Sequence, residues 1–141
     1  MMISRLTVGV MLTVLSVADI KKRQISLLEV FLIAGYGIIA AVMTGGLHFP
    51  DLIGGVAIGG ALLVLSLVSR KAIGPGDGLL MCATGILLGF KDNAAVLFVG
   101  LLICAVFSLV LLILKKAKGT TAVPFIPFLT ASYRIVILGK F

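Results

Sequence analysis

Long apolar runs, separated only by short polar loops, are the feature that most restricts how this chain can fold. Of its 141 residues, 61% are hydrophobic, whereas a soluble domain is typically about half apolar. Such a chain has too few polar side chains to cover its surface, so the sequence predicts that a lipid bilayer surrounds it. Residues 1–141 are predicted to form one compact domain.

Six apolar runs can be distinguished. They cover Met1 to Ala18, Leu27 to Gly45, Leu52 to Ser69, Asp77 to Phe90, Ala94 to Leu114 and Val123 to Leu138. The runs show no alternation of apolar and polar residues, and lipid admits only helices or closed barrels. The predicted fold class is therefore an all-α membrane protein, a bundle of six transmembrane helices with a short fourth helix.

Lys and Arg are shared unequally between the two sets of loops. The loops after the first, third and fifth runs hold eight (Lys21, Lys22, Arg23, Arg70, Lys71, Lys115, Lys116 and Lys118), and the other side holds four (Arg5, Lys91, Arg134 and Lys140). Because cytoplasmic loops carry the excess of positive charge, the first set is predicted to be cytoplasmic and both termini to lie outside. The net charge of +7 then reflects topology, and no basic face with interleaved aromatics indicates nucleic-acid binding.

Metal, disulfide and cofactor roles are not indicated. Cys82 and Cys104 lie in apolar runs without CxxC spacing, and His48 has no second metal ligand nearby. The first run also resembles a signal peptide cleaved after Ala18. The basic residues that follow it directly argue against that interpretation, because they favour retention of this end in the cytoplasm.

Two acids stand at the ends of apolar runs. Asp77 lies in "GPGDGLLM" at the start of the fourth run, and Asp19 lies in "SVADIKKRQIS" at the end of the first. The predicted topology places both at the cytoplasmic face. Each has an ordinary explanation when taken alone, since Asp19 could pair with the basic residues after it and Asp77 could be the N-cap of its helix. Both explanations remain open for the single acids.

A pair of carboxylates at one face has a chemistry that a single acid lacks. Two adjacent carboxylates do not both ionise easily and share a proton. One can then activate water as a general base while the protonated one polarises a scissile carbonyl. This predicts an aspartic peptidase that needs no metal, with Asp19 and Asp77 as catalytic residues of unassigned individual roles.

Glycines surround Asp77 and recur in the third run. Gly74, Gly76 and Gly78 are predicted to allow backbone angles closed to other residues and the close approach of an extended peptide. Gly55 and Gly59, four residues apart, predict close helix packing within the bundle or, alternatively, a homodimer interface. In "VPFIPFL", Pro124 and Pro127 mark either a helix start or a kink.

These segments resemble the type IV prepilin peptidases, a family of membrane aspartic proteases. "GPGDGLLM" resembles the GxGD motif of that family, "DIKKRQIS" its first-aspartate segment and "VPFIPFL" the start of its last helix. The resemblance implies that Asp19 and Asp77 are the catalytic pair. It also implies cleavage of the leader of a prepilin or pseudopilin precursor, at the cytoplasmic side of a bacterial or archaeal cell membrane. Longer relatives add a CxxC-containing domain that methylates the product, so cleavage without N-methylation is expected here.

Three further residues are candidate support or substrate contacts. The family often has a Lys shortly after GxGD, and because Leu79 follows Gly78 here, Lys71 is a candidate for that basic contact. Arg23, in the family's Arg-x-Ile element, could position the Asp19 loop or contact the substrate, and a topological role explains it at least as well. Glu29 is the remaining acid on the cytoplasmic side and is a candidate contact for a basic leader.

Three functions other than a prepilin peptidase are also compatible with some of these features. A small proton- or cation-coupled transporter could use the same two acids, but the halves of the chain lack the similarity of an inverted repeat. A non-catalytic pilus-assembly partner would not need both aspartates. Presenilin-like proteases share GxGD but should have Tyr before the first aspartate, where this chain has Ala18.

Overall fold

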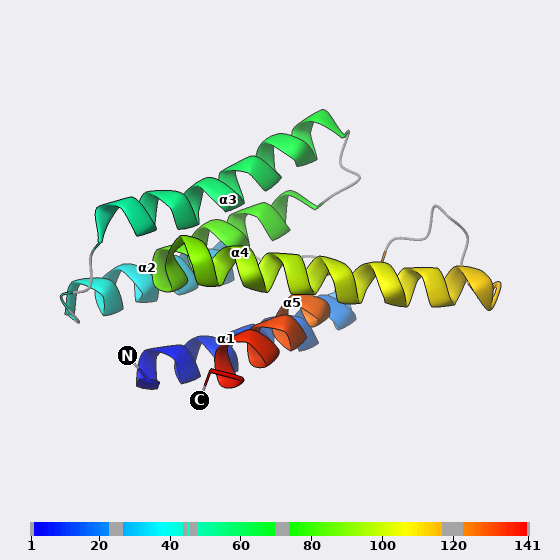
Figure 1. Cartoon of the computed structure of the whole chain (residues 1–141), viewed down its shortest axis with the longest axis horizontal. Helices are drawn as coiled ribbons and strands as arrows, with labels where there is room; N and C mark the ends of the chain where they lie inside the picture. The colour runs from blue at the N-terminus through cyan, green and yellow to red at the C-terminus, as the bar shows by residue number, and fades with distance from the viewer. Residues whose placement is uncertain are drawn as a thin grey trace.

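The computed structural model describes the chain as a bundle of helices (Figure 1). The residues described are 2–22, 27–43, 45, 48–69, 74–116 and 123–140. In chain order, the elements are α1 (Met2–Lys22), α2 (Leu27–Met43), α3 (Phe49–Val68), α4 (Pro75–Ile113), α5 (Ile126–Tyr133) and a π-helical segment, η1 (Arg134–Leu138). Within these ranges no strand is present, which agrees with the predicted all-α class.

The longest element, α4, is two helices rather than one. Gly89 interrupts it with φ of 72° and ψ of −177°, a left-handed conformation that glycine adopts without steric cost. The side chain of Asn93 then bonds to the carbonyl oxygen of Met81 at 3.0 Å. Twelve residues of straight helix span about 18 Å, so this bond requires the chain to double back. We call residues 75–88 the first arm and residues 90–113 the second arm.

The two arms of α4 differ in length. At 1.5 Å per residue, the first arm is about 21 Å long and the second about 36 Å. The second arm therefore extends past the start of the first, as the yellow end of α4 shows (Figure 1). The sequence predicts separate fourth and fifth helices, with the fourth beginning at Asp77. The structure confirms the short fourth helix, but begins it at Pro75 and makes the turn at Gly89.

The closest helix packing is between α3 and the first arm of α4. Gly55 and Gly59 are buried there. A Cβ on Gly55 would lie 2.9 Å from the carbonyl carbon of Gly85, and one on Gly59 would lie 2.7 Å from the Cα of Cys82. The small residues thus allow two backbones to touch, as in other membrane bundles. The pair serves packing within the bundle, and these two glycines offer no free surface to a second copy.

The last helix packs on α1. Thr130 donates a hydrogen bond to the carbonyl oxygen of Leu12 at 3.1 Å, and the buried Tyr133 donates one to the carbonyl oxygen of Arg5 at 2.8 Å. Pro127 lies in the first turn of α5, where its missing N–H costs nothing. Of the two interpretations of this proline, the structure therefore supports a helix start.

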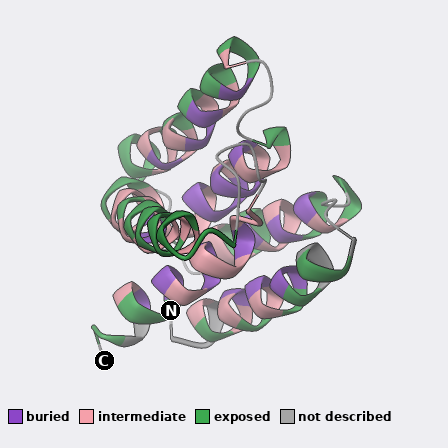
Figure 2. Ribbon diagram, turned by 90° about the vertical axis from the view of Figure 1, so that its right-hand side faces the viewer, coloured by how far each residue is buried: buried purple, intermediate pink, exposed green. Residues whose placement is uncertain are grey.

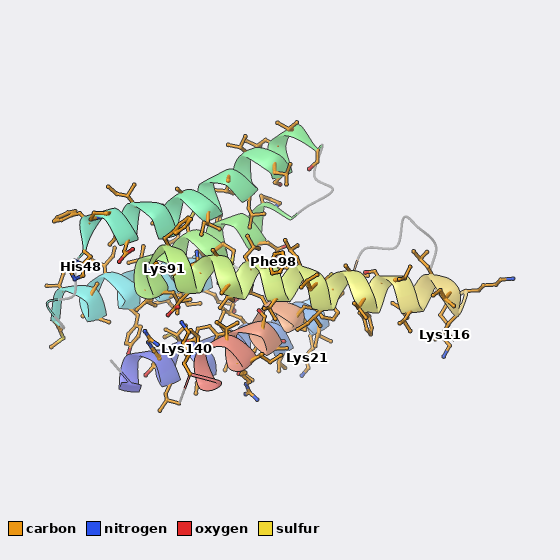
Figure 3. The ribbon with its side chains drawn as sticks, viewed as in Figure 1. Lys21, His48, Lys91, Phe98, Lys116 and Lys140 are labelled. Carbon is orange, nitrogen blue, oxygen red and sulfur yellow. The ribbon has the colours of Figure 1, made fainter. Side chains whose placement is uncertain are left out.

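Charged residues separate toward the two ends of the bundle. Lys21 and Lys116 lie toward one end, whereas His48, Lys91 and Lys140 lie toward the other (Figure 3). At the second end, Asp92 pairs with Lys140 and lies 3.5 Å from the guanidinium of Arg5. These ion pairs join the beginning of α1, the second arm of α4 and the end of the chain. The arrangement agrees with the two sets of basic residues distinguished in the sequence.

Much of the outer surface is apolar. In α2, the exposed side chains include Leu28, Phe31, Ile39 and Met43. In the far part of the second arm of α4, residues 101–113, most side chains are exposed and none is buried (Figure 2). Among the described residues, α3 and α4 are long and apolar enough to cross a membrane, while Arg5–Val17, Leu27–Met43 and Ile126–Ile137 are shorter apolar helices. This is the surface of a membrane protein. Six spans with both termini outside remain a prediction.

Candidate functional site

Asp77 lies in the first turn of α4, where the sequence placed it at the start of a helix. Gly74 is the N-cap, Pro75 occupies the first helical position, and the N–H of Asp77 donates to the carbonyl oxygen of Gly74 at 3.1 Å. Proline is favoured at the first helical position because its φ is already helical. The interpretation of Asp77 as the N-cap is therefore wrong, since Asp77 is the third residue of the helix.

The carboxylate of Asp77 lies next to the backbone of Gly74. A Cβ built on Gly74 would come within 3.3 Å of Oδ2 of Asp77, so a larger residue there would crowd the carboxylate. The half-buried Asp77 is also in the turn where backbone N–H groups and the helix dipole favour negative charge. The lack of a side chain at position 74 therefore leaves room for this carboxylate beside the backbone.

The three motif glycines have different surroundings. Gly74 has φ of −62° and ψ of 129°, a conformation open to any residue, and the glycines with positive φ in the described chain are Gly45 and Gly89. The prediction of unusual backbone angles in the motif is therefore wrong. Gly78 is buried, and its Cβ would lie 2.9 Å from the backbone nitrogen of Leu63. It serves the contact with α3, while Gly76 is half-buried.

Asp19 lies in the last turn of α1, and its side chain is outside the described part of the structure. The end of α1 and the start of α4 point toward the same end of the bundle (Figure 1). Lys21 and Lys116 lie toward that end as well (Figure 3). The fold thus brings the two aspartate-bearing helix ends to one end of the bundle, as the predicted topology requires.

The other candidates are only partly described. Glu29 lies in the first turn of α2 and is half-buried. Arg23 and Lys71 lie outside the described residues, so their proposed roles stay predictions. In the described ranges, no three His, Cys, Asp or Glu side chains gather in a way that could hold a metal ion.

A buried polar network was missed by the sequence analysis. Asn93 is fully buried. Its Nδ2 donates to the carbonyl oxygens of Gly55 and Met81, each at 3.0 Å, and its Oδ1 accepts a hydrogen bond from Thr84 at 2.9 Å. We call these four residues the Asn93 network. In the sequence, Asn93 lies in the polar stretch "KDN" between two apolar runs, and only the reversal at Gly89 turns it inward.

Comparison with known families identifies the chain. The model of the type IV leader peptidase family matches residues 6–109, which include most of α1, all of α2 and α3, the whole first arm and most of the second. The chain belongs to the type IV leader peptidase family. Both Asp19 and Asp77 fall within the match. The searches of curated proteins and of solved structures gave no match.

In this leader peptidase, the close packing of α3 on the first arm of α4 supports the helix that carries Asp77. The contacts of Gly55, Gly59 and Gly78 hold the first arm of α4 against α3, and Asp77 lies in the first turn of that arm. A peptidase needs its reacting groups on rigid elements. The first arm of α4 meets that requirement on the Asp77 side.

Proposed function

We propose that this peptidase is an aspartic endopeptidase that removes the leader peptide of prepilin-like precursors, with Asp19 and Asp77 activating the water that attacks the scissile bond. The observation that carries the proposal is the family match over residues 6–109, because it makes the chain a leader peptidase and spans both acids. The helix ends bearing these acids lie at one end of the bundle (Figure 1). A shared proton would let one carboxylate act as base and the other as acid.

The location of the reaction follows from charge. The end of the bundle that bears Asp19 and Asp77 also bears Lys21 and Lys116, members of the basic set predicted to be cytoplasmic. We therefore place cleavage at the cytoplasmic face of a multi-pass protein in the cell membrane. The test is cleavage of a prepilin-type precursor by membranes containing the chain, with Asp19→Asn and Asp77→Asn as the variants that must fail.

Glu29 is expected to contact the basic leader of the substrate. Its place in the first turn of α2 puts a carboxylate at the end of the bundle otherwise rich in Lys, where it would offset repulsion of a positive leader. Glu29→Gln should raise KM about two- to fivefold, the size of a partly exposed ion pair, and leave kcat nearly unchanged. Steady-state kinetics with a precursor peptide measure both constants.

A neutral leader provides the control for Glu29. With the basic residues of the leader replaced by glutamine, the wild type and Glu29→Gln should have the same KM, because the pair is already broken. A loss of kcat with either peptide would instead assign Glu29 to the reaction itself or to the fold, and would contradict the leader contact.

A further inference from the structure

The Asn93 network joins three helical segments, the two arms of α4 and α3. Asn93 comes from the second arm of α4, Met81 and Thr84 from the first arm, and Gly55 from α3. Both carbonyl oxygens can only accept hydrogen bonds, so they must face the amide nitrogen, and the Thr84 hydroxyl then faces the amide oxygen. The Asn93 side chain has one orientation that satisfies its partners. That orientation fixes the position of the first arm along its axis relative to α3 and to the second arm.

The network lies close to Asp77 along the helix. Met81 follows Asp77 by four residues, so the two lie on the same face one turn apart, about 5 to 6 Å along the axis. The intervening helix packs against α3 through Gly78 and Gly59, where a Cβ would strike the neighbouring backbone. A stiff, closely packed turn transmits the position of the Met81 carbonyl to the carboxylate.

We propose that Asn93 is a positioning residue for Asp77. The proposal rests on the proposed function, in which Asp77 takes part in catalysis. Sliding of the first arm along α3 would bring larger side chains to the places where the glycines now let the two backbones meet. The Asn93 network opposes such sliding, since a shift would separate a fully buried amide from its partners, and an unpaired amide in an apolar interior is unfavourable.

The test compares Asn93→Leu with wild type in precursor cleavage and in thermal unfolding in detergent. Leucine has a similar size and removes all three hydrogen bonds. We expect kcat per folded molecule to fall about 10- to 100-fold, since displacement of a catalytic group by about 1 Å can cost a factor near 100. KM should stay within about twofold, because the leader contact is on another helix.

A matched control separates positioning from stability. Tyr133→Phe also removes a hydrogen bond made by a buried side chain, that to the carbonyl oxygen of Arg5, but this bond joins α5 to α1 rather than holding the first arm of α4. It should lower the unfolding temperature and leave kcat per folded molecule within about twofold of wild type. An equal loss of kcat in Tyr133→Phe and Asn93→Leu would overturn the proposal.

Thr84 supplies a milder variant should Asn93→Leu fail to fold. Thr84→Val keeps the shape of the side chain but removes the hydrogen bond to Oδ1 of Asn93, and should lower kcat about three- to tenfold. Thr84→Ser keeps the hydroxyl and should restore most of the rate. Equal rates for Thr84→Val and Thr84→Ser would overturn the proposal.

Asp77→Asn in the same assay distinguishes a failure of the positioning proposal from a failure of the proposed function. If Asp77→Asn abolishes cleavage while Asn93→Leu and Thr84→Val keep the full kcat, positioning by Asn93 is wrong and the proposed function stands. If Asp77→Asn still cleaves at the wild-type rate, the proposed function is wrong, and the positioning proposal falls with it.

Discussion

Replacing Asp77 by asparagine should lower kcat for precursor cleavage by about a thousandfold or more. Asparagine keeps the size of the side chain but cannot hold the charge or accept and return a proton, and general acid–base catalysis typically contributes a factor of about 100 to 10,000. Asp19→Asn should have a comparable effect, because a two-carboxylate mechanism needs both groups. The measurement is cleavage by membranes in which each variant accumulates to the wild-type level.

The structure offers a matched control for this prediction. Asp51 lies in the first turn of α3 and is the third residue of its helix, as Asp77 is of α4, but at the opposite end of the bundle. Asp51→Asn removes the same favourable interaction with a helix N-terminus and should leave cleavage intact. Substantial cleavage by either Asp19→Asn or Asp77→Asn would remove that residue from the mechanism. Proton and cation flux would then be the property to measure.

Replacing Gly55 by alanine should destabilise the fold strongly. The new Cβ would strike the backbone carbonyl of Gly85, which cannot move without displacing the first arm of α4. We expect a loss of about 3 kcal/mol in the free energy of unfolding, the upper part of the range for overpacked sites. Unfolding in a denaturing detergent, followed by circular dichroism, measures the difference.

Gly60 is the control for Gly55. It lies on the same helix, and a Cβ built on it meets nothing within 4 Å. Gly60→Ala should therefore stabilise α3 slightly, by about 0.5 to 1 kcal/mol, because alanine loses less backbone entropy than glycine in a helix. A destabilisation of the same size in Gly55→Ala and Gly60→Ala would contradict the assignment of the Gly55 effect to its contact with Gly85, because a Cβ on Gly60 meets no neighbour.

Local patterns predicted the helices and the position of Asp77 well. Apolar runs indicate helices in lipid because the backbone has no other way to satisfy its hydrogen bonds there. The turn "GPGD" marks a helix start since proline is suited to the first helical position. The structure moved this start by only two residues, from Asp77 to Pro75.

Local sequence patterns did not predict the contacts between residues that are far apart in the chain. Nothing local shows that Gly55 meets Gly85, because small residues four apart suit packing inside one chain and between two chains equally. Asn93 looked like a loop residue since it follows Lys91 and Asp92, and its burial depends on a turn four residues earlier. Gly89 is visible in the sequence, but glycine is common in membrane helices. A glycine alone therefore does not predict that the chain reverses its direction there.

The unequal arms of α4 have a consequence for the depth of the reaction in the bilayer. The two arms meet at Gly89, and Asp77 lies twelve residues, or about 18 Å, from that turn. The hydrocarbon layer is about 30 Å thick, and the second arm is long enough to cross it. If the second arm crosses this hydrocarbon layer from one side to the other, Asp77 lies inside the layer, well below the lipid headgroups on its side. Water must therefore reach the carboxylate through the protein or through a locally thinned leaflet.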